Sequence, residues 1–210
     1  MAPSTRSAGY RCSIPGLAGF AGVPSPGIAL YVSQNGPEIQ RPRRWCKTQP
    51  MPDKLKVGSP PPAFSLPDQD GQTVKPGDYK GQWLVLYFYP NDDTPGCTIE
   101  ACDFTNGLKD FEKLDATVVG CSPNSLESHK KFIAKYKLKV RLLSDPEHKA
   151  MSAYGAWGEK VLYGKKSIGV IRSTVIVGPD GKVAHHWAKV KAKGHADAVR
   201  EKLEQLRAAA

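Results

Sequence analysis

Cys97 and Cys102 are the residues whose type and spacing point most directly to chemistry. They lie five positions apart, directly after the turn-forming sequence Thr94-Pro95-Gly96. Neighbouring thiols can be oxidised to a disulfide and reduced again by thiol exchange. The pair therefore indicates thiol redox chemistry.

The sequence around Cys97 has the pattern of a buried strand followed by a helix. Residues 83–89 form a short run of apolar, aromatic and β-branched side chains, which predicts a buried strand that ends at Pro90. Apolar residues then recur at helical spacing: Ile99, Phe104, Leu108, Phe111 and Leu114. We therefore expect Cys97 in the first turn of a helix, where free N–H groups and the helix dipole favour a thiolate.

Ionisation of the thiol does not by itself supply an enzymatic rate. A free cysteine is a few per cent ionised near pH 7, so complete ionisation gains about thirtyfold, or about 2 kcal/mol. Enzymes typically accelerate reactions by about a millionfold or more. Donors aimed at the developing charge must supply the rest, so we expect a cation and oriented N–H groups near Cys97.

The five-residue spacing also constrains how the second thiol takes part. On an ideal helix, residues five apart have Cα atoms about 8.6 Å from each other. A disulfide requires a separation below about 7 Å. Joining Cys97 to Cys102 therefore requires the first turns of the helix to unwind.

The segment from Pro90 to Cys102 resembles the active site of a known family. Pro90, followed by Thr94-Pro95-Gly96-Cys97-Thr98-Ile99-Glu100-Ala101-Cys102, is similar to that of peroxiredoxins of the peroxiredoxin Q, or bacterioferritin comigratory protein, type. Three shorter segments agree: Val57-Gly58 with Pro62-Ala63-Phe64, Gly169-Val170-Ile171-Arg172-Ser173-Thr174, and Gly194-His195. The resemblance covers about residues 54–207.

The resemblance implies a role for each matched residue. Cys97 would be the peroxidatic nucleophile, which becomes a sulfenic acid, and Cys102 would be the resolving thiol. Thr94 would hydrogen-bond the thiolate and the bound peroxide, and Pro90 would shield the site from water. Arg172 would supply the cation that the rate argument requires.

The same resemblance implies the reaction cycle. The enzyme would reduce hydrogen peroxide and organic hydroperoxides, form an intramolecular Cys97–Cys102 disulfide, and be recycled by thioredoxin or a similar reductant, in antioxidant defence. No dinucleotide fingerprint or phosphate loop is present, so we expect no bound cofactor. Because both thiols lie in one chain, catalysis does not require a dimer, and a monomer is expected.

The rest of the chain predicts an α/β protein with a thioredoxin-like fold, in which helices flank a central mixed β-sheet. Strands at residues 117–121 and 140–143, separated by a helix at about 125–136, continue the first strand in βαβαβ order, so the central strands should be parallel. A hairpin of residues 174–177 and 182–187 around a Pro-Gly turn, and a helix at about 196–207, should complete the domain. Arg172 would begin a hairpin strand.

Residues 1–50 have the composition of an organelle targeting segment. They contain six basic residues and one acidic residue, Glu38, with many Pro, Gly and Ser residues and little periodicity. Pro15, Pro24 and Pro26 would break an amphipathic helix, which favours a chloroplast over a mitochondrial destination. We expect this segment to be disordered and removed, taking Cys12 and Cys46 with it.

The remaining basic charge does not indicate a nucleic-acid site. Outside residues 1–50 the chain holds 24 basic and 19 acidic residues, and no nucleic-acid motif accompanies its lysine clusters. We interpret these lysines as solvated faces: Lys130, Lys131, Lys135, Lys137, Lys139, Lys165 and Lys166. No apolar run approaches the eighteen or so residues that a membrane span requires.

Other residues that could carry chemistry have simpler interpretations. Cys121 ends a predicted buried strand and fits a core position, with a role as an alternative resolving thiol still open. Glu100 fits a carboxylate that complements the helix dipole. The histidines lack metal-ligand spacing, so no metal site is expected, and we assign them to packing or solvent-facing positions: His129, His148, His185, His186 and His195.

Two other function classes remain open. A protein-disulfide oxidoreductase would share the thioredoxin-like fold, but it would normally carry Cys-x-x-Cys, which this chain lacks. A redox-inactive chaperone or interaction module is the non-enzymatic alternative. Rapid oxidation of one thiolate by peroxide would distinguish the peroxidase from both.

Overall fold

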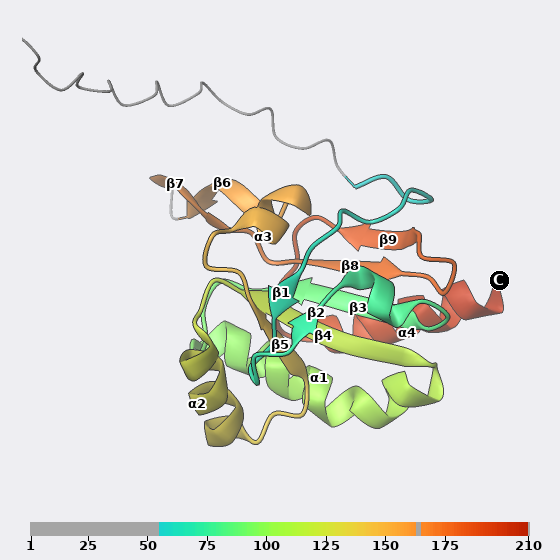
Figure 1. Cartoon of the computed structure of the whole chain (residues 1–210), viewed down its shortest axis with the longest axis horizontal. Helices are drawn as coiled ribbons and strands as arrows, with labels where there is room; N and C mark the ends of the chain where they lie inside the picture. The colour runs from blue at the N-terminus through green and yellow to red at the C-terminus, as the bar shows by residue number, and fades with distance from the viewer. Residues whose placement is uncertain (1–54, 163–164, 210) are drawn as a thin grey trace, which may run out of the picture. The chain divides into compact units, whose positions relative to one another are not determined.

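A five-stranded mixed sheet forms the centre of the part of the chain that the computed structural model describes, residues 55–162 and 165–209 (Figure 1). In spatial order its strands are β5 (Arg141–Ser144), β4 (Ala116–Ser122), β3 (Trp83–Phe88), β8 (Ser173–Val177) and β9 (Val183–Trp187). The predicted targeting segment, residues 1–50, lies outside the described residues.

The chain order explains which strands run parallel. Helix α1 (Pro95–Lys113) connects β3 to β4, and helix α2 (Leu126–Tyr136) connects β4 to β5, so these three strands are parallel. Strand β8 pairs antiparallel with both β3 and β9, and helix α4 (His195–Ala208) follows β9. The predicted mixed sheet, βαβαβ order, hairpin and terminal helix are confirmed.

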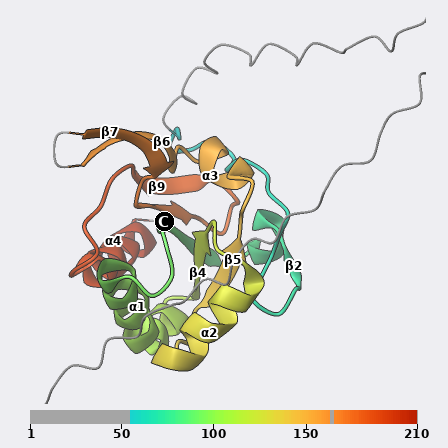
Figure 2. The same ribbon diagram turned by 90° about the vertical axis from the view of Figure 1, so that its left-hand side faces the viewer.

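Strand β3 is buried along its whole length because both faces of the sheet are covered. Val85 and Tyr87 pack into one core with residues of α1, α2 and α4. Leu84 and Leu86 alternate with them and pack into a second core on the other face, which includes Met151 of α3 (Lys149–Ala153). Figure 2 shows α1, α2 and α4 on one side of the sheet and α3 on the other. An unbroken apolar run is therefore the pattern that β3 requires.

Several short elements were not predicted from the sequence. They are the strands β1 (Leu66–Pro67) and β2 (Thr73–Val74), a 3₁₀ turn at Pro76–Tyr79, helix α3, and an antiparallel ribbon of β6 (Trp157–Leu162) and β7 (Lys165–Val170). The ribbon extends away from the central sheet in Figure 1. Among the described residues, no helix combines the length and the apolar character needed to cross a membrane.

Candidate active site

The pairing of β3 with β8 determines which residues meet at one end of the sheet. Phe88, the last residue of β3, lies opposite Ser173, the first residue of β8. The chain leaves β3 toward Cys97 at this point, and it enters β8 from Arg172. Two residues that are 75 positions apart in the sequence are therefore brought to the same edge of the sheet.

Cys97 lies in the first turn of α1, as the sequence predicted. Thr94 is the N-cap residue with extended backbone, and Pro95 occupies the first helical position. An N–H group at this position would have no partner within the helix, so proline, which lacks one, loses no hydrogen bond there. Cys97 is the third helical residue and is 1% exposed. The helix N-terminus directs backbone dipoles toward this thiol and favours its anionic form.

Arg172 supplies the cation that the rate argument requires. Its Nη2 donates a hydrogen bond to the sulfur of Cys97 at 3.1 Å, and its Nη1 forms an ion pair with Oε2 of Glu100. The two side chains of this ion pair are 14% and 0% exposed, respectively. A planar guanidinium can hold both groups at once because its donors point in fixed, separate directions. The predicted proximity of Arg172 and Cys97 is thus observed.

Glu100 differs from the sequence-based interpretation. Its carboxyl group is fully buried against Arg172, whereas a carboxylate that only complements the helix dipole would face solvent. Burial raises the pKa of Glu100 to about 7, although the charge of Arg172 acts in the opposite direction. Its Oε1 has no hydrogen-bond partner among the described residues, which also favours the neutral form. Glu100 is therefore part of the charge cluster around Cys97.

Thr94 and Pro90 lie on the segment that connects β3 to α1 and directly precedes Cys97 in the sequence. The hydroxyl of Thr94 donates to the carbonyl of Asn91 at 3.1 Å, and both Thr94 and Pro90 are half-buried. The hydroxyl proton of Thr94 is committed to this carbonyl, so the hydrogen bond from Thr94 to the Cys97 thiolate that the resemblance implies is not made in this structure. Its oxygen retains lone pairs that can accept a hydrogen bond from an incoming molecule.

Cys102 and Cys121 have different surroundings. Cys102 lies in α1, half-buried, and it is a free thiol, as is Cys97. Burial, followed by the nearby charge of Asp103, raises the pKa of Cys102, so this thiol is protonated at rest. Cys121 is fully buried in β4, and burial raises its pKa well above the usual range. This environment agrees with the predicted core position of Cys121.

Comparison with known proteins establishes the family. A model of the AhpC/TSA family matches residues 57–186. Peroxiredoxin Bcp of Bacillus subtilis is 44% identical over 153 residues, which are 73% of this chain and 96% of the relative. The chain belongs to the peroxiredoxin family. The predicted resemblance and thioredoxin-like fold are confirmed, and the protein is a thiol-dependent peroxidase, an oxidoreductase, rather than either alternative class.

Solved structures agree with this assignment. Peroxiredoxin Q of Xanthomonas campestris superimposes with a TM-score of 0.64 at 41% identity, covering 68% of this peroxiredoxin and 90% of that chain. A cysteine-to-serine variant of PrxQ from Xylella fastidiosa gives a TM-score of 0.68 at 36% identity, covering 72% and 96%. A 40% identical structure of the X. campestris bacterioferritin comigratory protein is described in connection with alkyl peroxide reduction.

His195 lies near the active site of this peroxiredoxin without adding a charge to it. Its Nε2 is 2.8 Å from the hydroxyl of Thr174, and its ring packs edge-on against Trp187. Burial, reinforced by the positive charge of Arg172, lowers the pKa of His195 to about 4. The imidazole is therefore neutral at physiological pH, in agreement with the predicted packing role.

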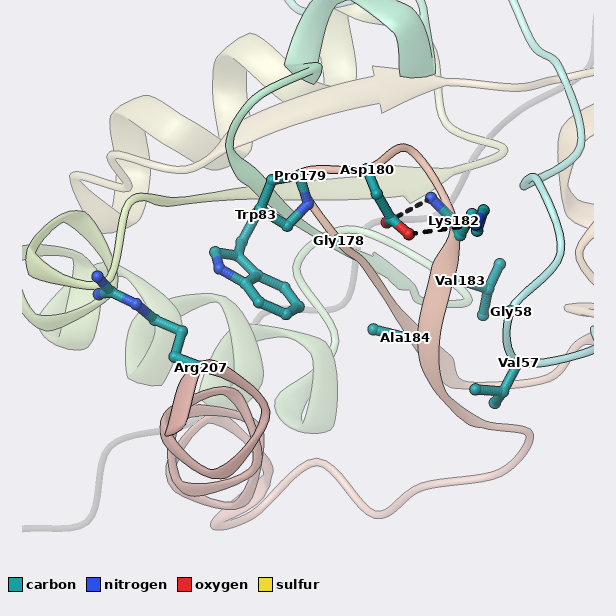
Figure 3. Close-up of a pocket in the computed structure, with 10 residues that line it drawn as sticks. All are labelled: Val57, Gly58, Trp83, Gly178, Pro179, Asp180, Lys182, Val183, Ala184 and Arg207. Carbon is teal, nitrogen blue, oxygen red and sulfur yellow. Dashed lines mark hydrogen bonds and ion pairs between the residues drawn. The ribbon is translucent and has the colours of Figure 1, made fainter. Parts of the chain in front are cut away.

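An apolar pocket lies at the other end of the sheet and is separate from the thiols (Figure 3). It has a volume of about 570 Å³ and lies beside Trp83, the first residue of β3, whereas Cys97 follows the last residue of that strand. Its charged side chains are already paired, Lys182 with Asp180 and Arg207 with Asp115. No cysteine lines it, so the pocket is not the site of the peroxidase reaction. Within the described ranges, no cluster of three or more potential metal ligands occurs.

Proposed function

We propose that this peroxiredoxin reduces hydrogen peroxide and organic hydroperoxides at Cys97, with Cys102 as the resolving thiol. The observation that carries the proposal is the 3.1 Å contact between Nη2 of Arg172 and the sulfur of Cys97 in the first turn of α1. A helix N-terminus and a cation together stabilise the thiolate, which is the nucleophilic form of cysteine. The alkyl peroxide reduction named for a similar structure supports the inclusion of organic hydroperoxides.

In the first step, the thiolate attacks the hydroxyl oxygen of the peroxide. An S–O bond forms as the O–O bond breaks, so the sulfur is oxidised to a sulfenic acid and the peroxide is reduced. The electron pair of the O–O bond stays on the leaving oxygen, which takes from solvent the equivalent of the proton that Cys97 lost on ionisation and departs as water or an alcohol. Arg172 is placed to meet negative charge as it moves from sulfur to oxygen.

Thr94 and Pro90 would organise the peroxide beside the thiolate. Because the hydroxyl proton of Thr94 is donated to Asn91, its oxygen is available to accept from the O–H group of a hydroperoxide. Such a bond would orient the attacked oxygen toward the sulfur of Cys97. Pro90 has no N–H group to hold water and would help to keep the site dry.

In the second step, the thiol of Cys102 attacks the sulfenic sulfur of Cys97. An S–S bond forms, the S–O bond breaks, and the hydroxyl leaves as water after taking the proton of Cys102. Both residues belong to α1, so the first turns of this helix must unwind for the sulfurs to meet. Thioredoxin or a similar dithiol protein then supplies two electrons by thiol–disulfide exchange.

The whole cycle uses thiols of one chain, so we propose that the active form is a monomer. The acid-poor, proline-interrupted composition of residues 1–50 supports import into the chloroplast, with the mitochondrion as the alternative. N-terminal mass spectrometry of the organelle-purified protein would locate the cleavage site. A mature protein that still carries residues 1–50 would contradict the targeting proposal.

The nucleophile is tested by rapid mixing of the reduced protein with hydrogen peroxide. We expect the wild type to lose one thiolate much faster than a free cysteine does, and the Cys97→Ser variant to lose this fast reaction. The Cys121→Ser variant, in which a buried core thiol is replaced, serves as the control and should keep it. Oxidation of the wild type at the rate of free cysteine would contradict the proposed function.

The resolving role is tested with Cys102→Ser. This variant should consume one equivalent of peroxide at the wild-type rate and then accumulate sulfenic acid, which dimedone trapping and intact-protein mass spectrometry detect. No intramolecular disulfide should form. If the variant recycles fully with thioredoxin, Cys102 is not the resolving thiol.

A further inference from the structure

A buried polar network anchors the loop that leads from β3 to Cys97. In this β3–α1 loop, residues 90–94, the carboxyl group of Asp92 is surrounded by donors. Tyr89 and Ser128 each donate a hydroxyl hydrogen bond to it at 2.7 Å, and Nδ1 of His129 lies 2.9 Å away. The side chains of His129 and Asp92 are 0% and 4% exposed. A buried carboxylate is stable only when it is paired and hydrogen-bonded to this degree.

His129 has a hydrogen-bond partner at each of its two ring nitrogens. Nδ1 faces the carboxyl group of Asp92, and Nε2 lies 3.2 Å from the carbonyl oxygen of Leu143. Burial by itself would raise the pKa of Asp92, but hydrogen bonds from His129, Ser128 and Tyr89 hold it below its usual range. These contacts tie His129 to the β3–α1 loop on one side and to β5 on the other.

The network connects the β3–α1 loop to elements that lie outside α1. His129 and Ser128 belong to α2, and Leu143 belongs to β5. A second connection runs through Asn124, which accepts from the backbone N–H of Asp92 at 3.0 Å and donates to the side chain of Asn91 at 2.7 Å. None of these hydrogen bonds involves a residue of α1. Unwinding the first turns of that helix would therefore leave all of them intact.

We propose that Asp92 and His129 are a positioning pair for the peroxidase reaction. They hold the β3–α1 loop against α2 and β5, which fixes the position where α1 begins and so places Cys97 next to Arg172. The loop keeps this position when the first turns of the helix unwind. After the disulfide is reduced, the helix can therefore form again with Cys97 next to Arg172. The pair contacts neither thiol nor peroxide and acts only through the position of the loop.

The proposal rests on the proposed function and makes separate claims about individual variants. Asp92→Asn and His129→Gln each disrupt the hydrogen-bonded Asp92–His129 pair, whereas Ser128→Ala removes one donor to Asp92 and leaves that pair in place. Asp110→Asn is the matched control, because Asp110 lies outside the β3–α1 loop and its side chain makes only an exposed ion pair with Lys113. Quenched-flow mixing with hydrogen peroxide, followed by mass spectrometry, measures the rate at which Cys97 is oxidised per folded molecule.

We expect Asp92→Asn and His129→Gln to lower this rate constant at least tenfold, at a temperature where circular dichroism shows them folded. Ser128→Ala should lower it a few-fold, and Asp110→Asn should stay within twofold of the wild type. A merely structural role would lower the melting temperature and leave the rate per folded molecule unchanged. A wild-type rate in folded Asp92→Asn or folded His129→Gln would overturn the proposal, and if neither variant folds, a wild-type rate in Ser128→Ala overturns it.

Failure of the proposed function gives a different result, because the wild type itself would then react no faster than Cys97→Ser.

Discussion

At Cys97, one cation faces two acids. Arg172 binds the sulfur of Cys97 with Nη2 and the carboxyl group of Glu100 with Nη1. When Cys97 is a thiolate and Glu100 is neutral, the cluster has no net charge, and the charge of Arg172 serves the thiolate alone. When Glu100 ionises, its carboxylate also interacts with Arg172, and the stabilisation of the thiolate by Arg172 becomes weaker. Because burial raises the pKa of Glu100 to about 7, this change falls within the physiological range.

The Glu100→Gln variant tests whether this sharing affects the reaction. Glutamine keeps an oxygen that accepts from Arg172 but cannot ionise, so the charge of Arg172 remains with Cys97 at every pH. We expect the ratio of the variant's rate constant for peroxide to that of the wild type to rise a few-fold as pH increases through about 7. Stopped-flow measurements across pH 5 to 9 give this ratio, and a ratio that does not change with pH would count against the shared charge.

The same variant should have a different pH dependence of stability. The unfolded chain ionises Glu100 near the ordinary glutamate pKa of 4.5, whereas the folded protein does so near 7. Ionisation is therefore easier in the unfolded state, and the wild type should lose about 3 kcal/mol of unfolding free energy through this group as pH rises across that range. Urea unfolding should show that Glu100→Gln lacks this loss. If the unfolding free energies of the wild type and Glu100→Gln changed with pH in parallel, a raised pKa of Glu100 would be excluded.

At the scale of elements, α1 carries both the nucleophile and the resolving thiol. The intact helix includes Cys97 and Cys102, both as free thiols, so the structure represents the reduced protein before any disulfide has formed. Five residues of regular helix hold the two Cα atoms too far apart for a disulfide. The first turns of α1 must therefore lose their backbone hydrogen bonds in the oxidised state.

Hydrogen–deuterium exchange measures this loss directly. We expect amides of residues 97–102 to exchange faster after stoichiometric oxidation by peroxide, while those of α2 keep their protection. The Cys102→Ser variant is the control, since it can form the sulfenic acid but not the disulfide, and its α1 should stay protected. Unchanged protection of residues 97–102 in the fully disulfide-bonded wild type would contradict the unwinding step.

Elements with strong periodic patterns could be predicted from the sequence, and weakly patterned ones could not. Strand β3 and helix α1 each bury apolar side chains. The aromatic and β-branched run of β3 and the helical spacing of apolar residues in α1 therefore appear in the sequence as recognisable patterns. The β6–β7 ribbon is held by pairing between its own two strands, and side chains such as Ile168 remain exposed. Only the end of the ribbon at Trp157 and Val170 packs into the core, so most of its length has no buried face and no alternating pattern to detect.

At the scale of the whole molecule, the active site is formed by segments that are far apart in the sequence. The resemblance nominated Arg172, but its contact with Cys97 depends on the pairing of Phe88 with Ser173, which no local pattern specifies. The burial of Glu100 was not predicted, although a signal was present. Glu100 lies four residues before Phe104 and three after Cys97, so it shares their buried helix face. The hydrogen bond between Asp92 and His129 was missed because the two residues are 37 positions apart.

Activation of Cys97 by Arg172 can be measured as the single-turnover rate of Cys97 oxidation in the Arg172→Lys variant. Lysine keeps the charge but offers one nitrogen, which cannot hold both the sulfur and Glu100 in the geometry of the guanidinium. Arg207→Lys, at an exposed ion pair with Asp115, is the matched control. We expect a loss of about a hundredfold, or about 2.7 kcal/mol, in Arg172→Lys and no change in the control. A wild-type rate in folded Arg172→Lys would contradict activation of the thiolate by this guanidinium.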